Sequence, residues 1–271
     1  MIRRFTGPLL ASALLVLPGA VALAETGALP ALPDLPATDP VGLGTNTACA
    51  DPAQVRLSAL PPALVLVAVS APCRAGEPVR VAHGGMSFGA LMDDRGRYHV
   101  TLPALADPAE VSVTVGDDAP VSARQPVPDL VSVTRLALGQ RGRADLHLAA
   151  DLPAMGDAPA RRVDPVAPGL PTLAQGGFLT RLGDPALAAP HLAEVLTLPA
   201  DRGGAALSLL AGVTADNCGR DLLATLALSA PDRPPAAGAI SLALPDCDAV
   251  GERLVVSDAD LRGLLVAPPA P

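Results

Sequence analysis

The chain has 271 residues, a net charge of −8 and no lysine, and although 50% of it is hydrophobic it holds only three Phe, one Tyr and no Trp. Such an acidic chain lacks the basic face that binding to nucleic acid or to an anionic membrane needs, and it lacks the aromatic platforms on which sugars usually stack. Its core must be built from Leu, Val and Ala.

The first 24 residues have the pattern of a cleaved secretory signal peptide. Arg3 and Arg4 precede an apolar run over residues 8–24, which closes on the small-residue pattern Ala22-Leu23-Ala24. An uncleaved membrane anchor is the alternative, and the prolines within the run disfavour it. We therefore expect a periplasmic or secreted protein that is not inserted in the membrane after cleavage.

Four cysteines in an exported chain indicate disulfides, because the compartments outside the cytoplasm are oxidising. They fall into two sequential pairs, Cys49 with Cys73 and Cys218 with Cys247. Crossed pairings would have to span the linker between the two domains described next, so the sequential pairing is expected. Their spacing does not match a CxxC zinc or redox site.

Composition divides the rest of the chain into two predicted domains. The expected organisation is a Pro-rich disordered linker at 25–47, a first β-sandwich domain at 48–150, a Pro-containing linker at 151–172, a second β-sandwich domain at 173–266 and a disordered tail at 267–271. Evenly spaced short strands with turn residues between them favour an all-β sandwich or barrel. Helices are the alternative for the Ala-rich parts of the second domain. Arg161-Arg162 in the linker is interpreted as a solvated or protease-sensitive spot.

Alternation of apolar and polar residues predicts the individual strands. In the first domain they are expected at 55–60, 63–69, 79–81, 98–102, 110–115, 130–138 and 144–148. In the second they are expected at 177–182, 192–198, 205–213, 221–229, 239–244 and 252–256. The turn residues at 93–96 predict a hairpin between 79–81 and 98–102, with 110–115 as the third neighbouring strand.

The run from Asp94 to Pro103, DRGRYHVTLP, resembles the D-x-G-x-Y-x-V-x-L-P signature of carboxypeptidase-regulatory-like and transthyretin-like domains. That resemblance covers about 49–150. It implies a small Ig-like or transthyretin-like sandwich used for adhesion, scaffolding or carbohydrate contact. More loosely, the segments 70–73 through 102–103 and 181–185 are similar to a group of exported Gram-negative bacterial proteins, some labelled translocase. No residue here supports that label.

The segment Gly85-Met86-Ser87-Phe88-Gly89 matches the G-x-S-x-G pattern in which Ser87 would be the nucleophile of a hydrolase. That pattern requires a sharp strand-to-helix turn, and only three residues separate it from the turn at 93–96. The βαβ alternation of such hydrolases is also missing from the chain. We therefore interpret Ser87 as a strand residue.

Metal and cofactor signals are weak. The histidines His83, His99, His147 and His191 lack metal-site spacing, although the predicted hairpin would bring His83 beside His99. The acidic pairs Asp246/Asp248 and Asp258/Asp260 do not match a calcium loop. No cofactor and no catalytic residue are expected.

The sequence predicts a non-enzymatic, exported binding or scaffold protein of the cell envelope with a protein partner there. The alternatives are a periplasmic serine hydrolase that uses Ser87, and a carbohydrate-binding or metal-binding module.

Overall fold

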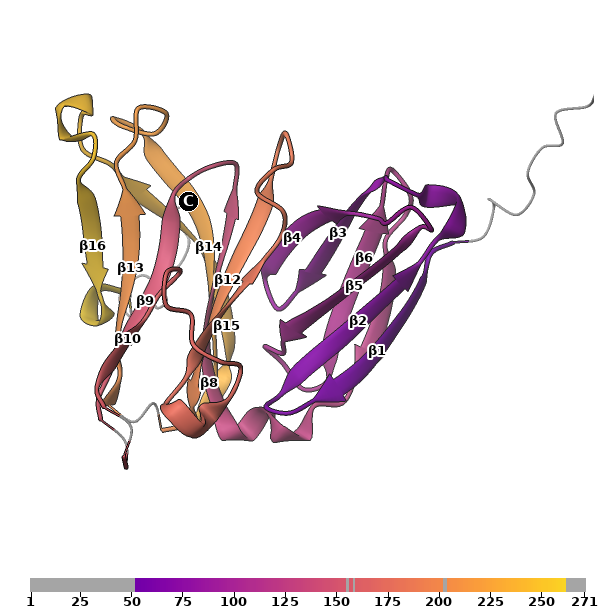
Figure 1. The fold of residues 1–271 in the computed structure, drawn as a ribbon, viewed down its shortest axis with the longest axis horizontal. Coiled ribbons are helices and arrows are strands. Elements are labelled where there is room, and N and C mark those ends of the chain that lie inside the picture. The colour runs from indigo at the N-terminus through magenta and orange to yellow at the C-terminus, as the bar shows by residue number, and fades with distance from the viewer. Residues whose placement is uncertain (1–51, 155, 158, 202–203, 262–271) are drawn as a thin grey trace, which may run out of the picture. The chain divides into compact units, whose positions relative to one another are not determined.

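The computed structural model describes residues 52–154, 156–157, 159–201 and 204–261. The expected signal peptide, the linker at 25–47 and the tail at 267–271 lie outside these residues. The described part is all-β, with 54% of its residues in strands that form several antiparallel sheets (Figure 1). The predicted all-β class is thereby confirmed. No helix of the described residues is long and apolar enough to cross a bilayer.

The strands up to residue 125 form two sheets. Sheet A has the order β1-β2-β5 and sheet B the order β4-β3-β6-β7. Their strands are β1 (Gln54–Leu60), β2 (Leu64–Ser70), β3 (Pro78–His83), β4 (Met86–Leu91), β5 (Arg97–Pro103), β6 (Ala109–Val115) and β7 (Val121–Gln125). Alternate valines of β2 and β6 are buried in the same hydrophobic cluster, so the two sheets share one core.

The predicted hairpin between 79–81 and 98–102 is wrong. β5 pairs with β2 in sheet A, with Val67 opposite Val100, whereas β3 pairs in sheet B with β4 and β6. The turn at 93–96 connects β4 to β5. Alternation did not predict the bounds of β4, because its residues, MSFGAL, include glycine and alanine and lack a clean apolar-polar alternation, but the interpretation of Ser87 as a strand residue is confirmed. The expected neighbourhood of 79–81 and 110–115 is correct, since Val81 lies opposite Val113.

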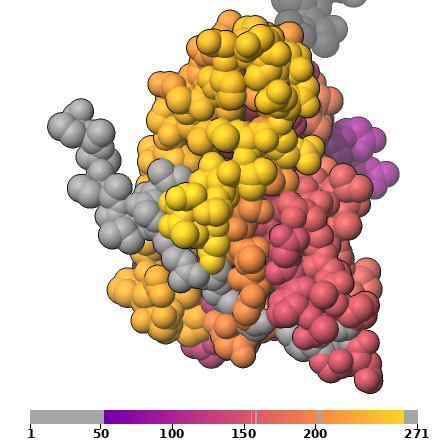
Figure 2. All heavy atoms as spheres, turned by 90° about the vertical axis from the view of Figure 1, so that its left-hand side faces the viewer, coloured from indigo at the N-terminus to yellow at the C-terminus, as the bar shows by residue number. Residues whose placement is uncertain are grey.

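The remaining strands form two further sheets, C and D. Sheet C has the order β11-β12-β8-β14-β15 and sheet D the order β10-β9-β13-β16. The strands are β8 (Val133–Arg141), β9 (Leu146–Leu152), β10 (Arg161–Val163), β11 (Phe178–Leu182), β12 (His191–Pro199), β13 (Ala206–Gly212), β14 (Asp221–Ala230), β15 (Arg233–Ala243) and β16 (Arg253–Ser257). Figure 2 shows yellow residues near the C-terminus beside orange and magenta residues from earlier in the chain. Sheet D thus joins distant parts of the sequence.

The chain passes from sheet B to sheet C at the short 3-10 helix Pro128–Ser132. Before this helix β7 pairs with β6, and after it β8 pairs with β12 and β14. β8 and β9 were expected to close the first domain, yet Leu138 of β8 lies opposite Glu194 and Leu226 in sheet C. Residues 161–163, within the expected linker, form β10 against β9. The Ala-rich segments at 205–213 and 239–244 lie in the strands β13 and β15, so these segments do not form the helices that were the alternative.

The central strands of sheet C, β8 and β12, are buried on both faces. One face contributes residues such as Ala137 and Val195 to the core of sheets A and B, and the other packs Leu136, Leu138 and Leu196 against sheet D. β8 is accordingly buried from Val133 to Gln140. A strand that contacts apolar neighbours on both sides loses the alternation that marks a half-exposed strand.

Arg135 of β8 ties sheet C to the loops of the first two sheets. Its side chain is fully buried, and Nη1 donates to the carbonyl oxygens of Ala63 and Ala104, each at 2.6 Å. Nη2 donates to Pro62 O at 2.7 Å, and Nε donates to Thr197 Oγ1 at 3.1 Å. Burial lowers the pKa of Arg135 to about 9, so the guanidinium is still charged at neutral pH.

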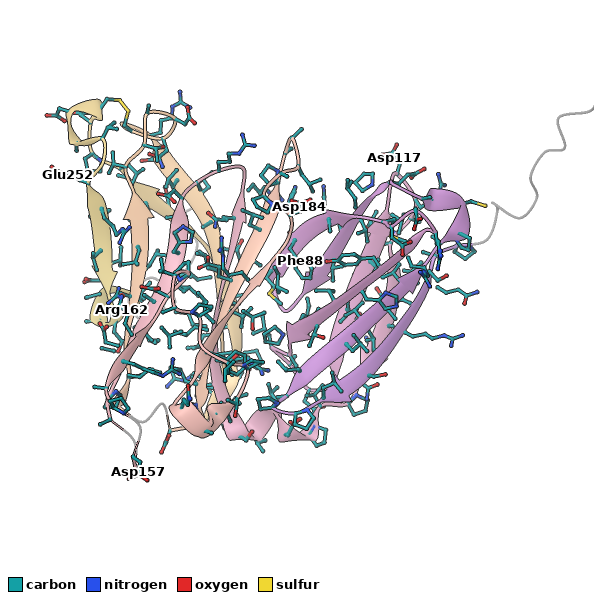
Figure 3. All side chains as sticks on the ribbon, viewed as in Figure 1. Phe88, Asp117, Asp157, Arg162, Asp184 and Glu252 are labelled. Atoms are coloured by element: carbon teal, nitrogen blue, oxygen red, sulfur yellow. A yellow bond between two sulfur atoms is a disulfide. The ribbon has the colours of Figure 1, made fainter. Side chains whose placement is uncertain are left out.

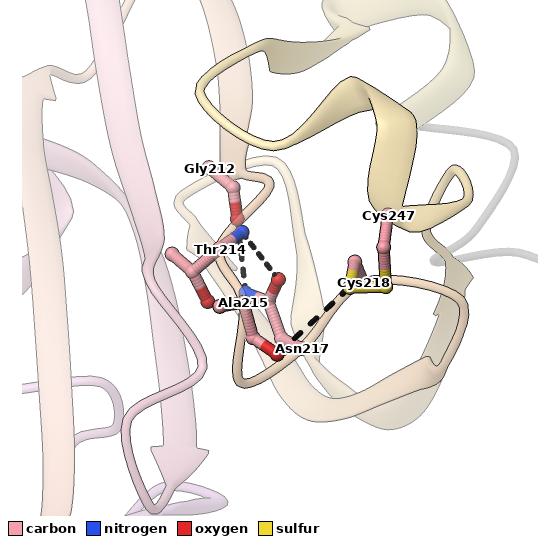
Figure 4. Close-up of a disulfide and its surroundings, with 6 residues drawn as sticks. All are labelled: Gly212, Thr214, Ala215, Asn217, Cys218 and Cys247. Carbon is pink, nitrogen blue, oxygen red and sulfur yellow. Dashed lines mark hydrogen bonds between the residues drawn. A yellow bond between two sulfur atoms is a disulfide. The ribbon is translucent and has the colours of Figure 1, made fainter.

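The predicted disulfide between Cys218 and Cys247 is confirmed, with a Cα–Cα distance of 4.9 Å (Figure 4). It holds the turn after β13 to the 3-10 helix Cys247–Ala249. Asn217 supports the same turn, because its side chain accepts from Thr214 N and donates to Gly212 O. Cys73 is also disulfide-bonded. Its expected partner, Cys49, lies outside the described residues.

Replacing Cys218 and Cys247 together by serine is expected to lower the free energy of unfolding by about 3 kcal/mol, because the bridge closes a long loop in the unfolded chain. The two residues are 29 positions apart. Urea unfolding of the variant and the wild type measures the difference. A loss below about 1 kcal/mol would mean that the Asn217 hydrogen bonds hold the turn without the bridge.

Candidate ligand-binding groove

The G-x-S-x-G segment runs through β4 rather than through a strand-to-helix turn. Ser87 is half-buried and lies opposite Ala82 of β3. His83 is the nearest histidine in sequence, but both of its ring nitrogens contact the main chain. Nε2 accepts from Leu105 N at 2.8 Å, so Nδ1 carries the proton and donates to Glu110 O at 2.8 Å.

Burial lowers the pKa of His83 and keeps the ring neutral, with the charge of Arg135 acting in the same direction. The backbone contacts therefore leave no free ring nitrogen to take a proton from Ser87. The structure brings the two residues onto neighbouring strands without joining them into a nucleophile and base.

The expected meeting of His83 and His99 does not occur. His83 lies on β3 in sheet B, and the exposed His99 lies on β5 in sheet A. Within the described ranges no group of three or more His, Cys, Asp or Glu side chains is arranged to hold a metal ion. Asp246 and Asp248 are exposed at the 3-10 helix of the disulfide, and Asp260 accepts a hydrogen bond from Ser257 Oγ at 2.6 Å.

Strand β4 packs against sheet C through small residues, and we call this line of contact the seam. A Cβ atom on Gly139 of β8 would lie 3.7 Å from the Cα of Met86, and one on Gly89 would lie 3.9 Å from the Cβ of His191. These are ordinary van der Waals distances, so β4 and sheet C are in direct contact at both positions. The loop before β12 adds a main-chain bond, since Asp184 N donates to Gly89 O at 2.8 Å; Figure 3 labels Asp184 and the neighbouring Phe88.

Two cavities open along the seam. The first, of about 350 Å³, is lined by residues that include Ser87, Gly139, Arg141 and Thr225. The second, of about 380 Å³, is lined by residues that include Arg80, Gly89, Asp117 and His191. His191 and Arg141 lie directly opposite each other on β12 and β8, so the two cavities adjoin along β4. We call them together the seam groove.

The seam groove is rich in positive charge for an acidic protein. Arg80 and Arg141 are exposed and line it, and His191 lies between them. Burial lowers the pKa of His191, and the charges of Arg80 and Arg141 lower it further. The imidazole is therefore neutral at neutral pH, and its two neighbours carry the charge.

A second polar cluster lies between sheets C and D and was not anticipated from the sequence. Glu194 of β12 is buried, and its Oε2 accepts a hydrogen bond from Leu148 N at 2.8 Å. Leu148 lies on β9 just beyond the residues that pair with β10. Its Oε1 accepts from His147 Nδ1 at 2.8 Å. Asp145 contacts the other ring nitrogen of His147 at 3.1 Å. The carboxylate of Glu194 thus accepts the main-chain hydrogen bond of Leu148 where β10 no longer does, so its role is structural.

Replacing His147 by glutamine is expected to cost more stability at pH 6 than at pH 9. The hydrogen bond to Glu194 raises the pKa of His147 above its ordinary value of 6.5, with the carboxylate charges adding to the effect. A raised pKa stabilises the fold below the unfolded value, and the contribution is lost as pH rises through the folded value. Chemical unfolding of both proteins at the two pH values measures it. An equal cost at both would contradict a protonated His147.

Searches for a matching family model, a curated relative and a similar solved structure find none. Function is therefore inferred from the geometry of the seam groove.

Proposed function

We propose that this protein is a non-enzymatic binding or scaffold protein of the cell envelope, exported to the periplasm or secreted, and built from two β-sandwich domains. Sheets A and B would form the first domain, in line with the transthyretin-like resemblance of residues 94–103, and sheets C and D the second. The ligand or envelope partner binds in the seam groove.

The observation that carries this proposal is a pre-formed groove whose two walls are fixed to each other. Arg135 of sheet C donates hydrogen bonds to the carbonyl oxygens of Ala63 and Ala104. The main-chain N–H of Asp184 donates to the carbonyl oxygen of Gly89 on β4. A site with rigid walls loses little conformational entropy when it is occupied. A pre-formed hollow of this size also fits the usual properties of ligand-binding sites.

The hydrolase alternative receives less support from the same geometry. Ser87 faces the groove as a lining hydroxyl, and the ring nitrogens of His83 contact Glu110 O and Leu105 N. A serine nucleophile needs a base within hydrogen-bond reach. A serine-reactive probe that labels the wild type and fails to label Ser87→Ala would overturn the non-enzymatic proposal.

The test is affinity capture of the tagged chain 25–271 from the envelope of its native host after brief cross-linking. Ser87→Arg fills the seam groove and should abolish recovery of the partner. Ser122→Arg is the matched control, because Ser122 is exposed on β7 at the opposite edge of sheet B. Equal recovery with both variants would overturn the assignment of the groove as the binding site.

A further inference from the structure

Two arginines face the seam groove without a protein partner. Arg80 of β3 lies opposite Gly89, and Arg141 of β8 lies opposite His191. Neither guanidinium makes an ion pair or a side-chain hydrogen bond in the part of the chain that the structure describes. Arg135 lies on the same face of β8, six residues before Arg141, and its guanidinium donates four hydrogen bonds. Unlike Arg135, Arg141 therefore has a guanidinium that is available to a ligand.

His191 lies at the same place and lines the cavity that Arg80 also lines. Its Nδ1 is buried and has no hydrogen-bond partner among the described residues. Because Gly89 has no side chain, the space between Arg80 and the imidazole stays open.

We propose that the His191 end of the seam groove binds the oxyanion of a small ligand, a carboxylate or phosphoryl group held between Arg80 and Arg141 beside the imidazole of His191. The fork of an arginine matches the paired oxygens of either group. This proposal rests on the proposed function, since it names the ligand chemistry of the same groove.

The rest of the cavity constrains the ligand. Asp117, on the turn between β6 and β7, is the acidic residue among those that line the 380 Å³ cavity. Its carboxylate repels a second negative charge on that side and accepts a hydrogen bond from a hydroxyl or amino group. The ligand is therefore a small hydroxylated or aminated acid or phosphate ester, rather than an extended polyanion.

Calorimetric titration of the chain 25–271 with inorganic phosphate and, separately, with lactate, a hydroxylated monocarboxylate, tests the site. We expect saturable binding of one anion per chain, weakened about tenfold or more by Arg80→Gln and by Arg141→Gln, because each removes a charge-assisted contact. Stronger binding of phosphate assigns a phosphoryl ligand, and stronger binding of lactate a carboxylate. Circular dichroism checks that the variants are folded.

Arg56→Gln is the matched control, since Arg56 is exposed on β1 in sheet A and the change in net charge is the same. The proposal is overturned if neither anion binds, or if Arg56→Gln weakens binding as much as Arg141→Gln. In the capture experiment, a partner lost with Ser87→Arg but retained with Arg80→Gln and Arg141→Gln would overturn the oxyanion site and leave the binding function standing.

Discussion

Replacing Arg135 by methionine is expected to lower the free energy of unfolding by about 3 to 5 kcal/mol. The methionine fills much of the volume but cannot donate, so the carbonyl oxygens of Pro62 and Ala104 lose their donor, and Ala63 O keeps only the bond from Ala104 N. Each unsatisfied buried acceptor carries its own desolvation cost. Chemical unfolding followed by circular dichroism measures the loss.

Two variants control this prediction. Arg141→Met makes the same chemical change at an exposed position of the same strand, and should alter stability by less than about 0.5 kcal/mol. Thr197→Val removes only the acceptor of Arg135 Nε and should cost less than Arg135→Met. If Arg135→Met were as stable as the wild type, water would have to satisfy the carbonyl oxygens of Pro62 and Ala104, and the walls of the seam groove would not depend on Arg135.

The strands whose one face is exposed were predictable from alternation alone. More buried and more exposed residues alternate along most of β1, β6 and β16, although Leu60 and Val255 are exposed, and the sequence located all three strands within two residues of their ends. β8 was also found as a strand, but it was assigned to the wrong neighbours. Its pairing with β12 and β14 joins residues fifty or more positions apart, and periodicity carries no information about partners.

The candidate site was less predictable, because its members matter through contacts rather than through spacing. Ser87 was singled out because of the G-x-S-x-G motif, whereas in the structure it lines the seam groove. His191 was seen only as a scattered histidine. Nothing in the sequence distinguishes Arg135, which is buried and fully bonded, from Arg141, which is exposed and unbonded. That difference depends on which loops lie over the end of β8.

Replacing Phe88 by alanine is expected to cost about 3 to 5 kcal/mol of stability, because a fully buried aromatic side chain leaves a large cavity in a core of smaller side chains. Phe88→Leu keeps most of the apolar volume and should cost less than about 1.5 kcal/mol. Unfolding in urea measures both variants against the wild type.

Phe88 also anchors β4, whose next residues on either side, Ser87 and Gly89, line the two cavities of the seam groove. Lactate or phosphate binding should therefore weaken in Phe88→Ala and be restored in Phe88→Leu, in step with stability. Unchanged stability in Phe88→Ala would mean that the core does not hold β4 in place. The seam groove would then have no fixed wall, and both the binding function and the oxyanion site would lose their structural basis.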